Sequence, residues 1–479
     1  MLEIESKQNT KILATVGPAC DSYDNLLALV KAGVDVFRLN FSHGTHKQHQ
    51  DVINRVQYIN DKYGTHIGIL ADLQGPKLRV GDIKDGGIQL DQGDEIVFTN
   101  EKMIGTKEGG VYMSYPQFAQ DVQEGEMVMV DDGKLVFQVV STNKKDKVTL
   151  KTLFGGVLKP KKGVNLPNTK ISLPCLTEKD LIDLEFILTQ PVNWIALSFV
   201  RSPEDLRDLR RRVYAKGHPA KILAKIEKPE ALVNLKEIIK ESNGIMVARG
   251  DLGIEVPMER LPIVQKDIIK KCLKYARPVI VATQMLDSMT TNPFPTRAEV
   301  TDVANAVMDG ADCLMLSGET STGDHPVTVV RQMAKIITEA EKKYDIKDKR
   351  PKTNSKARTF NSDVVCNIAA TAAEDLKAKA IIGVTSSGYT AFRVSSFRPK
   401  TDIYIFSDRI HMLATLNLVW GVQCFYYDRF TSTDNSMIEI NEYLKENGFV
   451  KKGDIVINTG SMPLQKRHRT NMLKVSEID

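Results

Sequence analysis

The sequence lacks the features that mark secreted and membrane proteins. Its six cysteines are scattered over 479 residues without a Cys-x-x-Cys pair, which argues against a disulfide framework and a structural zinc site. No apolar run approaches the length that spans a bilayer. The opening residues, MLEIESKQNTK, have no apolar core of the signal-peptide type. These absences predict a cytoplasmic protein with no membrane partner.

An excess of one charge is also missing. The chain has 65 lysines and arginines against 60 aspartates and glutamates, so its composition gives no argument for nucleic acid or a membrane surface as partner. Low-complexity segments are absent as well. A chain of this length exceeds one domain and is long enough to bury several large cores.

Short apolar runs alternate with helical patterns over most of the first 345 residues, and most runs end in polar residues. Eight strands are expected, near residues 12, 36, 68, 195, 222, 246, 279 and 314. Eight successive strand-helix units favour a closed (β/α)8 TIM barrel, whose active site lies at the C-terminal strand ends. The competing fold is an open doubly wound sheet, in which the polar ends gather at one switch point.

Two changes of texture divide the chain. From 76 to 174, short alternating or β-branched runs replace the helical periodicity, which predicts an inserted all-β lid domain. A second boundary is expected at 341–360, which is dense in charge, and a helix and four strands follow it. The expected domains are a catalytic barrel of residues 1–75 and 175–345, the lid, and a C-terminal α/β regulatory domain of residues 346–479.

One strand-helix-strand unit, residues 221–257, concentrates charge. A helix over 229–241 is expected to end at Asn243-Gly244, because these residues accept a left-handed conformation. Two parallel strands joined by a helix place their C-terminal ends on one edge of the sheet. That edge is predicted to bring together Lys225, Glu227, Arg249 and Asp251.

Glu227 and Asp251 are the candidate metal ligands. Two carboxylates without histidine or cysteine suit Mg²⁺ or Mn²⁺ better than zinc, and the alternative is a surface ion-pair cluster. Lys225 precedes Glu227 by two residues and shares its face of the strand, so its ammonium can stabilise negative charge that develops on a substrate. The loop from Gly250 to Gly253 suits an anion at a helix start, or is an ordinary loop.

Polar residues also follow other expected strands of the barrel, and they occur in the third domain. Arg38, with its neighbours up to His43, can clamp a phosphoryl group. Thr283 and Ser317 are hydroxyls bonded to the backbone, or a proton relay. The Thr-Ser-Ser-Gly-Tyr-Thr loop at 385–390 is a phosphate cradle or a helix cap. The basic run at 466–469 reaches the same anion, or is a solvated charge run.

Seven motifs together resemble the pyruvate kinase family: RLNFSHG, DLQGPKLRV, KIEKPEAL, MVARGDLGIEVP, ATQMLDSM, NPFPTRAEVTDVANAV and MLSGET. They occur in the family's order, and the resemblance covers essentially the whole chain. It implies phosphoryl transfer from phosphoenolpyruvate to ADP, which yields pyruvate and ATP in the last step of glycolysis. It also implies a homotetramer and a barrel whose β lid is inserted after the third strand.

The resemblance assigns a role to each matching residue. Glu227 and Asp251 hold the divalent ion, and Lys225 stabilises the transferring phosphoryl group and the enolate. Arg38 grips the phosphate, while Thr283 and the backbone N–H groups of Gly250 and Asp251 hold the carboxylate. Thr283 and Ser317 help to deliver a proton through water. ADP meets Asn40, His43, Arg79 and Lys162.

One departure from the family concerns potassium. Potassium-dependent members carry a glutamate where this chain has Lys77, and a Thr-Lys pair where it has Leu73-Gln74. An ammonium at Lys77 can replace the monovalent cation in its pocket, so K⁺ is not expected to be required. The residues of that pocket are Asn40, Ser42 and Asp72.

A second departure concerns regulation. The loop at 385–390 resembles the family's effector site, whereas the closing segment QKRHRTN resembles its effector loop only loosely. A phosphorylated activator is expected, with AMP or a sugar monophosphate favoured. The expected effector-binding residues are Thr385, Ser386, Ser387, Gly388 and Thr390.

Two other functions compete with this interpretation. A Mg²⁺-dependent aldolase acting on 2-oxo acids can use a similar Glu/Asp pair with an arginine, but it needs neither the β insertion nor the third domain. A non-catalytic sugar-phosphate sensor requires an inactive barrel site. The intact residues Lys225, Glu227, Asp251 and Thr283 argue against a sensor.

Overall fold

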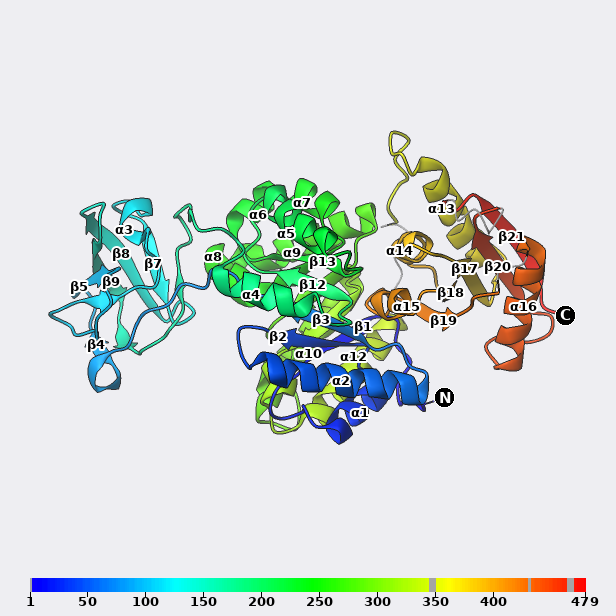
Figure 1. The fold of residues 1–479 in the computed structure, drawn as a ribbon, viewed down its shortest axis with the longest axis horizontal. Coiled ribbons are helices and arrows are strands. Elements are labelled where there is room, and N and C mark those ends of the chain that lie inside the picture. The colour runs from blue at the N-terminus through cyan, green and yellow to red at the C-terminus, as the bar shows by residue number, and fades with distance from the viewer. Residues whose placement is uncertain (1, 344–349, 430–431, 463–468) are drawn as a thin grey trace.

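Eight parallel strands close into a barrel in the computed structural model, which describes residues 2–343, 350–429, 432–462 and 469–479. This confirms the predicted (β/α)8 fold and excludes the open sheet. Figure 1 shows the barrel between the all-β part on one side and the C-terminal α/β part on the other. The barrel strands are β1 (Lys11–Thr15), β2 (Val36–Asn40), β3 (Gly68–Asp72), β12 (Trp194–Leu197), β13 (Lys221–Ile226), β14 (Gly244–Ala248), β15 (Val279–Ala282) and β16 (Cys313–Leu316).

Helices follow the barrel strands, and their ends agree with the local sequence. Thr177 and Thr296 each form a capping box, in which the threonine hydroxyl and an acidic side chain three residues later satisfy backbone N–H groups. The helices are α1 (Tyr23–Ala32), α2 (His46–Tyr63), α4 (Glu178–Ile187), α5 (Pro203–Ala215), α6 (Pro229–Val233), α7 (Leu235–Glu241), α8 (Arg249–Glu255), α9 (Leu261–Tyr275), α10 (Arg297–Asp309), α11 (Gly318–Ser321) and α12 (Pro326–Glu341). Two short 3₁₀ turns, η2 (Met258–Arg260) and η3 (Asp287–Thr290), complete this part.

The single helix expected over 229–241 is wrong, because α6 and α7 are separate helices. Asn234 lies between them with φ −93° and ψ 11°, outside the helical conformation. Its side-chain amide donates to the Arg201 carbonyl at 2.9 Å. This contact with the preceding strand-helix loop accompanies the break in the helix, and no local sequence pattern announces it.

The left-handed ending expected at Asn243-Gly244 is also wrong. Helix α7 ends at Glu241, and the backbone of its C-cap residue, Ser242, is extended. Asn243 pairs with Ile222 instead, since its N–H donates to the Ile222 carbonyl at 2.8 Å and its side-chain oxygen accepts the Ile222 N–H at 3.0 Å. The chain therefore enters β14 directly at Gly244, and tertiary pairing replaces the turn.

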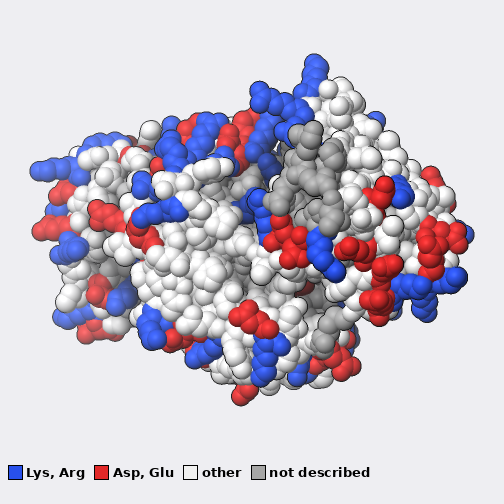
Figure 2. Space-filling view, turned by 45° about the vertical axis from the view of Figure 1, so that its right-hand side comes forward, with Lys and Arg blue, Asp and Glu red and all other residues white. Residues whose placement is uncertain are grey.

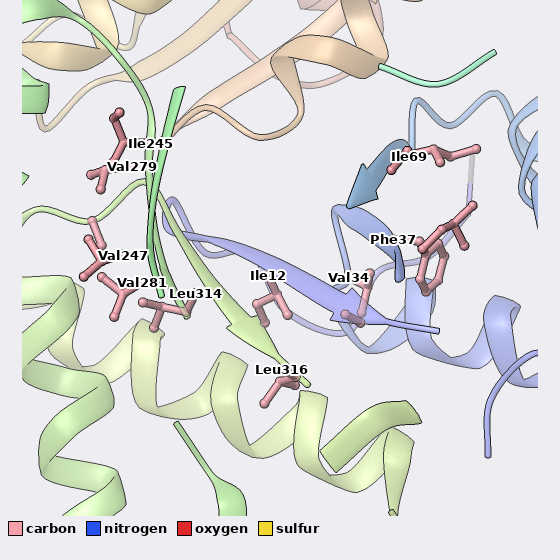
Figure 3. Packing of buried hydrophobic residues seen from close by; sticks show 14 of the residues in the cluster. Ile12, Val34, Phe37, Ile69, Ile245, Val247, Val279, Val281, Leu314 and Leu316 are labelled. Atoms are coloured by element: carbon pink, nitrogen blue, oxygen red, sulfur yellow. The ribbon is translucent and has the colours of Figure 1, made fainter. Parts of the chain in front are cut away.

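The barrel strands separate two apolar cores. Outward-facing residues pack against the surrounding helices, and Figure 3 shows Val281, Leu314 and Leu316 pointing toward them. The inner core fills the N-terminal end of the barrel and includes Leu418 of the C-terminal part. From the barrel, the inner core takes Leu13, Val36, Leu70, Trp194, Ala196, Leu223, Met246, Ile280, Ala282, Cys313 and Met315.

The part inserted after β3 is all-β apart from short turns. It contains a six-stranded sheet in the order β11-β7-β8-β9-β5-β6 and a separate two-stranded sheet of β10 and β4. A hairpin joins the antiparallel strands β7 and β8, and Asp132 and Gly133 in its turn both have positive φ. The elements are η1 (Lys84–Gly86), β4 (Ile88–Leu90), β5 (Glu95–Thr99), β6 (Val111–Tyr112), α3 (Phe118–Asp121), β7 (Met127–Val130), β8 (Leu135–Thr142), β9 (Lys147–Phe154), β10 (Gly156–Leu158) and β11 (Val164–Asn165).

The C-terminal part is a five-stranded sheet with helices. The four predicted strands are present as β19, β18, β17 and β20, which run parallel, and an unexpected fifth strand, β21, joins the edge antiparallel. The elements are α13 (Phe360–Asp375), β17 (Ala380–Val384), α14 (Tyr389–Ser396), β18 (Asp402–Ser407), α15 (Ile410–Leu416), β19 (Val422–Tyr426), α16 (Thr433–Glu446), β20 (Ile455–Gly460) and β21 (Met472–Glu477).

Figure 2 shows basic and acidic side chains interspersed over the visible face, in keeping with the near-neutral composition. Among the described residues, no helix combines the length and the apolar character needed to cross a bilayer.

Candidate active site

Polar side chains occupy the C-terminal end of the barrel interior. Successive residues of a strand face opposite sides, so a residue two places beyond an inner apolar residue also points inward. Leu223 belongs to the inner core, and the same phase carries on to Lys225 and Glu227. The polar side chains in this inward phase at the strand ends include Thr15, Arg38, Asn40, Asp72, Ser198, Lys225, Glu227 and Ser317.

Asp72 connects the two cations expected to handle phosphate. Its Oδ2 accepts a hydrogen bond from Arg38 Nε at 2.7 Å, and its Oδ1 lies 3.2 Å from Lys225 Nζ. Burial opposes the charge of the carboxylate, but Lys225 and Arg38 outweigh it and lower the pKa of Asp72. Burial likewise opposes the ammonium, and Asp72 and Glu227 outweigh it and raise the pKa of Lys225. The cluster is therefore ionised.

Glu227 is a buried carboxylate held in one orientation. Its Oε2 accepts the Phe199 N–H at 2.7 Å, and its Oε1 lies 3.1 Å from Lys225 Nζ. Burial raises the pKa of Glu227, Lys225 opposes this effect, and the negative charge of Asp251 adds to it. Two carboxylates that repel each other at one rim fit a divalent cation, which removes the repulsion.

The donor set at this rim suits a hard cation that keeps other oxygen ligands. Within the described residues, no three His, Cys, Asp or Glu side chains converge as a metal cage. Mg²⁺ is commonly held by one or two carboxylates together with substrate oxygens. Glu227 and Asp251 match that pattern, and a zinc cage does not.

Thr283 and Gly250 meet where β14 and β15 end. Helix α8 begins at Arg249, as expected for this loop, and the Gly250 N–H donates to Thr283 Oγ1 at 2.8 Å. Thr283 has a φ of 70°, an uncommon conformation for a β-branched residue. Arg249 is tied to Asp302 at 2.7 Å and donates to the Thr283 carbonyl at 2.6 Å. Arg249 thus braces the loop and is not a free cation at the rim.

Ser317 ends β16 with a hydroxyl that has no hydrogen-bond partner among the described residues, although it is buried. Its N–H donates to the carboxylate of Glu319 at 2.6 Å, and the same carboxylate accepts the Leu286 N–H at 3.3 Å. The backbone is thus anchored while the hydroxyl stays available. An available buried hydroxyl at the rim fits contact with a ligand or water.

The expected nucleotide residues come from two parts of the chain. Asn40 ends β2 and His43 follows it, whereas Arg79 and Lys162 belong to the inserted part, where Lys162 Nζ pairs with Asp131 at 2.8 Å. Burial lowers the pKa of His43, and the charges of Arg79, Lys77 and Arg38 lower it further. The pKa of His43 is therefore affected by Arg79 and Lys77, two cations of the inserted part.

A pocket lies between the insertion and the barrel. Its lining includes Asp132 and Asn165 from the insertion, and Phe199, Lys228 and Asp251 from the barrel. Asn165 donates to Glu255 at 3.0 Å, and Lys228 Nζ pairs with the same carboxylate at 2.6 Å. The insertion thus touches the barrel next to the carboxylate rim.

Lys77 lies near this rim but does not reach the expected cation pocket. Its side chain is exposed, and within the described residues it forms no ion pair with Asp72. The two Asp72 oxygens face Arg38 and Lys225 instead. Asn40 turns its side-chain oxygen to the Ser42 N–H at 3.1 Å. Replacement of potassium by Lys77 stays a prediction.

The expected effector loop joins β17 to α14. Thr385 Oγ1 accepts the Gly388 N–H at 3.0 Å, and Gly388 has a φ of 82°. Thr390 Oγ1 lies 2.6 Å from Thr470 Oγ1, which ties the loop to the C-terminal segment. Ser386 is half-buried and Ser387 is exposed. Of the basic run at 466–469, the first three residues lie outside the described part of the chain.

Sequence reasoning missed several residues at the rim. Ser198 Oγ accepts from Lys225 Nζ at 2.7 Å, Phe199 holds Glu227, and Thr15 Oγ1 accepts from Arg38 at 3.1 Å. Ser198 and Thr15 share the inward phase of their strands, so counting from the inner apolar residues would have found them. The Phe199 contact is made by backbone and has no sequence signal.

The fold and this rim define a class. A closed (β/α)8 barrel with paired cations and carboxylates at its C-terminal strand ends is a barrel enzyme built for an anionic substrate. Models of the pyruvate kinase barrel domain and of the pyruvate kinase alpha/beta domain match residues 7–330 and 363–476. The chain belongs to the pyruvate kinase family, whose members transfer a phosphoryl group from phosphoenolpyruvate to ADP.

Similar proteins agree with this assignment. The chain is 42% identical over 470 residues to a pyruvate kinase of Staphylococcus haemolyticus, covering 98% of this chain and 80% of the relative. It is 40% identical over 476 residues to that of Geobacillus stearothermophilus, covering 98% and 81%. The crystal structure of a pyruvate kinase from Cryptosporidium parvum superposes with a TM-score of 0.91 at 34% identity, covering 98% of this chain and 96% of that one.

Proposed function

We propose that this chain makes pyruvate and ATP at the rim formed by Arg38, Lys225, Glu227, Asp251 and Thr283. The observation that carries the proposal is the run of contacts Arg38–Asp72–Lys225–Glu227, with N···O distances of 2.7, 3.2 and 3.1 Å. Two positive side chains converge there beside a carboxylate pair. Such a site suits an anionic substrate whose charge is redistributed during transfer.

Each residue of the rim has a task in this proposal. Arg38 grips the phosphoryl group, and Lys225 stabilises the group in transfer and the enolate that remains. Thr283, with the N–H groups of Gly250 and Asp251, holds the substrate carboxylate. Protonation of the enolate carbon proceeds through water between Thr283 and Ser317, supported by the unpartnered Ser317 hydroxyl. Asn40, His43, Arg79 and Lys162 receive ADP.

The metal of this reaction is a divalent cation, which we propose is Mg²⁺ or Mn²⁺ held by Glu227 and Asp251. When bound, it supplies Lewis acidity and neutralises phosphoryl charge. The Phe199 N–H fixes Glu227, so one ligand is oriented before the ion arrives. The inserted part acts as a lid that excludes water.

An assay of pyruvate formation from phosphoenolpyruvate and ADP tests the proposal. We expect turnover in Mg²⁺ that EDTA abolishes and added Mg²⁺ or Mn²⁺ restores, because two carboxylates and the phosphoryl oxygens are left without a counter-ion. Pyruvate is measured by its conversion to lactate in a coupled assay. Turnover that persists in EDTA at the same rate contradicts the assigned metal role.

Potassium is not expected to be needed. The proposal is supported by Lys77, whose positive charge already acts at His43 beside the expected pocket. Turnover in sodium- and potassium-free buffer should change less than about twofold on adding K⁺, because Lys77 places a positive charge beside the expected pocket where potassium-dependent members of the family carry a glutamate. Lys77→Glu, which removes that charge, should gain a K⁺ requirement. A large rise in parent turnover with K⁺ refutes the proposal.

A phosphorylated activator is proposed to bind the loop of Thr385, Ser386, Ser387, Gly388 and Thr390. Support comes from hydroxyls and a glycine at the start of α14. AMP and sugar monophosphates should lower the phosphoenolpyruvate concentration for half-maximal rate, and Ser386→Asp should abolish the response by repelling phosphate. Titration of pyruvate formation measures this. If the unmodified enzyme responds to neither AMP nor any sugar monophosphate, the proposed regulation is wrong.

The family also suggests the assembly and the domain limits. We propose a cytoplasmic homotetramer whose domains are residues 1–75 with 175–345, 76–174 and 346–479. Exposed apolar side chains on and beside α9 and α10, namely Met258, Ile263, Phe294 and Met308, support burial against another subunit. Light scattering that returns the mass of one chain contradicts the assembly.

A further inference from the structure

We propose that the dipeptide Ser198-Phe199, directly after β12, positions Lys225 and Glu227 for phosphoryl transfer. The inference rests on the proposed roles of Lys225 and Glu227 and adds the residues through which the fold sets their geometry. Neither residue of the dipeptide touches the substrate in this proposal. Both act through a neighbour on β13.

The hydroxyl of Ser198 gives the Lys225 ammonium its shortest contact. Ser198 Oγ accepts from Lys225 Nζ at 2.7 Å, against 3.1 Å to Glu227 and 3.2 Å to Asp72. The hydroxyl proton of Ser198 is committed to the Leu73 carbonyl at 2.7 Å. The lone pairs of Ser198 Oγ therefore point in a set direction and fix the position of the Lys225 ammonium. Attraction to the two carboxylates alone does not define that position as closely.

Phe199 holds the metal ligand by its backbone. Its N–H donates to Glu227 Oε2 at 2.7 Å, which leaves Oε1 on the side of Lys225. The N–H reaches this oxygen because Phe199 adopts a φ of 55°, a strained value for a bulky residue. The Cys175 thiol donates to the Phe199 carbonyl at 3.0 Å and helps to hold that conformation.

Close packing against Gly75 restricts the position of Ser198-Phe199. A Cβ at Gly75 would lie 2.8 Å from Phe199 Cδ2 and 2.9 Å from Ser198 Cβ. Gly75 has a φ of 68°, and its N–H donates to Asp180 at 3.2 Å. Ser198 is itself 2% exposed. The end of β3 and the start of α4 thus clamp the dipeptide against β13.

The geometry makes the two contacts a unit. Lys225 and Glu227 are two residues apart and share one face of β13, while Ser198 and Phe199 are adjacent and reach them by side chain and by backbone. A shift of the dipeptide moves the cation and the metal ligand together. Misplacement by about 1 Å can cost ~10²-fold in rate, so this support is expected to matter for turnover.

Three variants test the inference by the split between kcat and KM. Ser198→Ala should lower kcat by about 10- to 100-fold and leave the KM for ADP and the Mg²⁺ half-saturation unchanged, because the Phe199 contact is backbone. Ser198→Thr keeps the hydroxyl and should recover most of the loss. Ser242→Ala is the matched control, since Ser242 is buried in the same barrel and donates to the Ile239 carbonyl at 3.2 Å, with no contact to the rim.

The outcomes separate this inference from the proposed function. A Ser198→Ala enzyme with unchanged kcat, or a Ser198→Thr enzyme as slow as Ser198→Ala, overturns the positioning role while an inactive Lys225→Met enzyme still supports the proposed function. Turnover retained in Lys225→Met overturns both. If Ser198→Ala does not fold, Ser198→Cys replaces it, because a thiol keeps the shape but accepts weakly. Unchanged kcat in Ser198→Cys then contradicts the inference.

Discussion

Lys225→Met is expected to lower kcat by about 10²–10³-fold, which is the effect of removing one group that stabilises transition-state charge. Methionine is unbranched and only one heavy atom shorter than lysine, so it keeps most of the packing of the lysine methylenes. The change removes the ammonium that lies between Asp72 and Glu227, so the rim loses one of the two positive side chains proposed to stabilise the phosphoryl group. Steady-state pyruvate formation measures the loss, and far-UV circular dichroism checks the fold.

Lys11→Met is the matched control for this change. Lys11 is a buried lysine that pairs with Asp35 at 3.4 Å and donates to the Val422 carbonyl at 3.0 Å. It begins β1 and so lies at the opposite end of the barrel from the rim. Lys11→Met should lose stability but keep turnover per folded molecule. If both variants lose turnover alike, the effect of Lys225 is not local to the rim.

Arg398→Met is expected to destabilise the protein by about 3–5 kcal/mol, because it leaves the buried carboxylate of Asp312 without its cation. The fully buried guanidinium lies 2.9 Å from Asp312 and donates to the Gly310 carbonyl at 2.8 Å. Arg398 follows α14 in the C-terminal part, whereas Asp312 precedes β16 of the barrel. The pair therefore joins two parts of the chain, and the urea midpoint of unfolding should fall.

An exposed ion pair gives the comparison for this prediction. Lys216 and Glu185 lie 2.6 Å apart with side chains 50% and 64% exposed, and such pairs contribute about 0–1 kcal/mol. Lys216→Met should therefore leave the urea midpoint nearly unchanged. Equal shifts for Arg398→Met and Lys216→Met would show that the buried pair does not hold the two parts together.

The barrel could be predicted because its signal is local and repeated. Each strand is a short apolar run that ends in polar residues, and this pattern located all eight strands. Helix ends with a cap, such as Thr296, were also predictable, since side chain and backbone satisfy each other within four residues. The break at Asn234 and the pairing of Asn243 with Ile222 were not predictable, because their partners lie elsewhere in the fold.

The rim was predictable only in part. Lys225, Glu227 and Asp251 could be predicted because each stands at the end of an apolar strand. Parallel pairing of β13 with β14 then places all three at one edge of the sheet. The same reasoning did not predict that Arg249 pairs with Asp302 on α10, because 53 residues separate the two in the chain. The place of Asp72 in a monovalent-cation pocket stays a prediction, and its contacts with Arg38 and Lys225 were not predicted.

The sequence by itself determined the barrel, its insertion, the family and the chemical kinds of side chain at the rim, because these depend on periodicity and strand order. Only the tertiary structure decided which charges pair, which backbone N–H holds Glu227, and how Ser198 meets Lys225. The reason is that such contacts join strands distant in the chain. Their partners are set by how the closed barrel brings strand ends together.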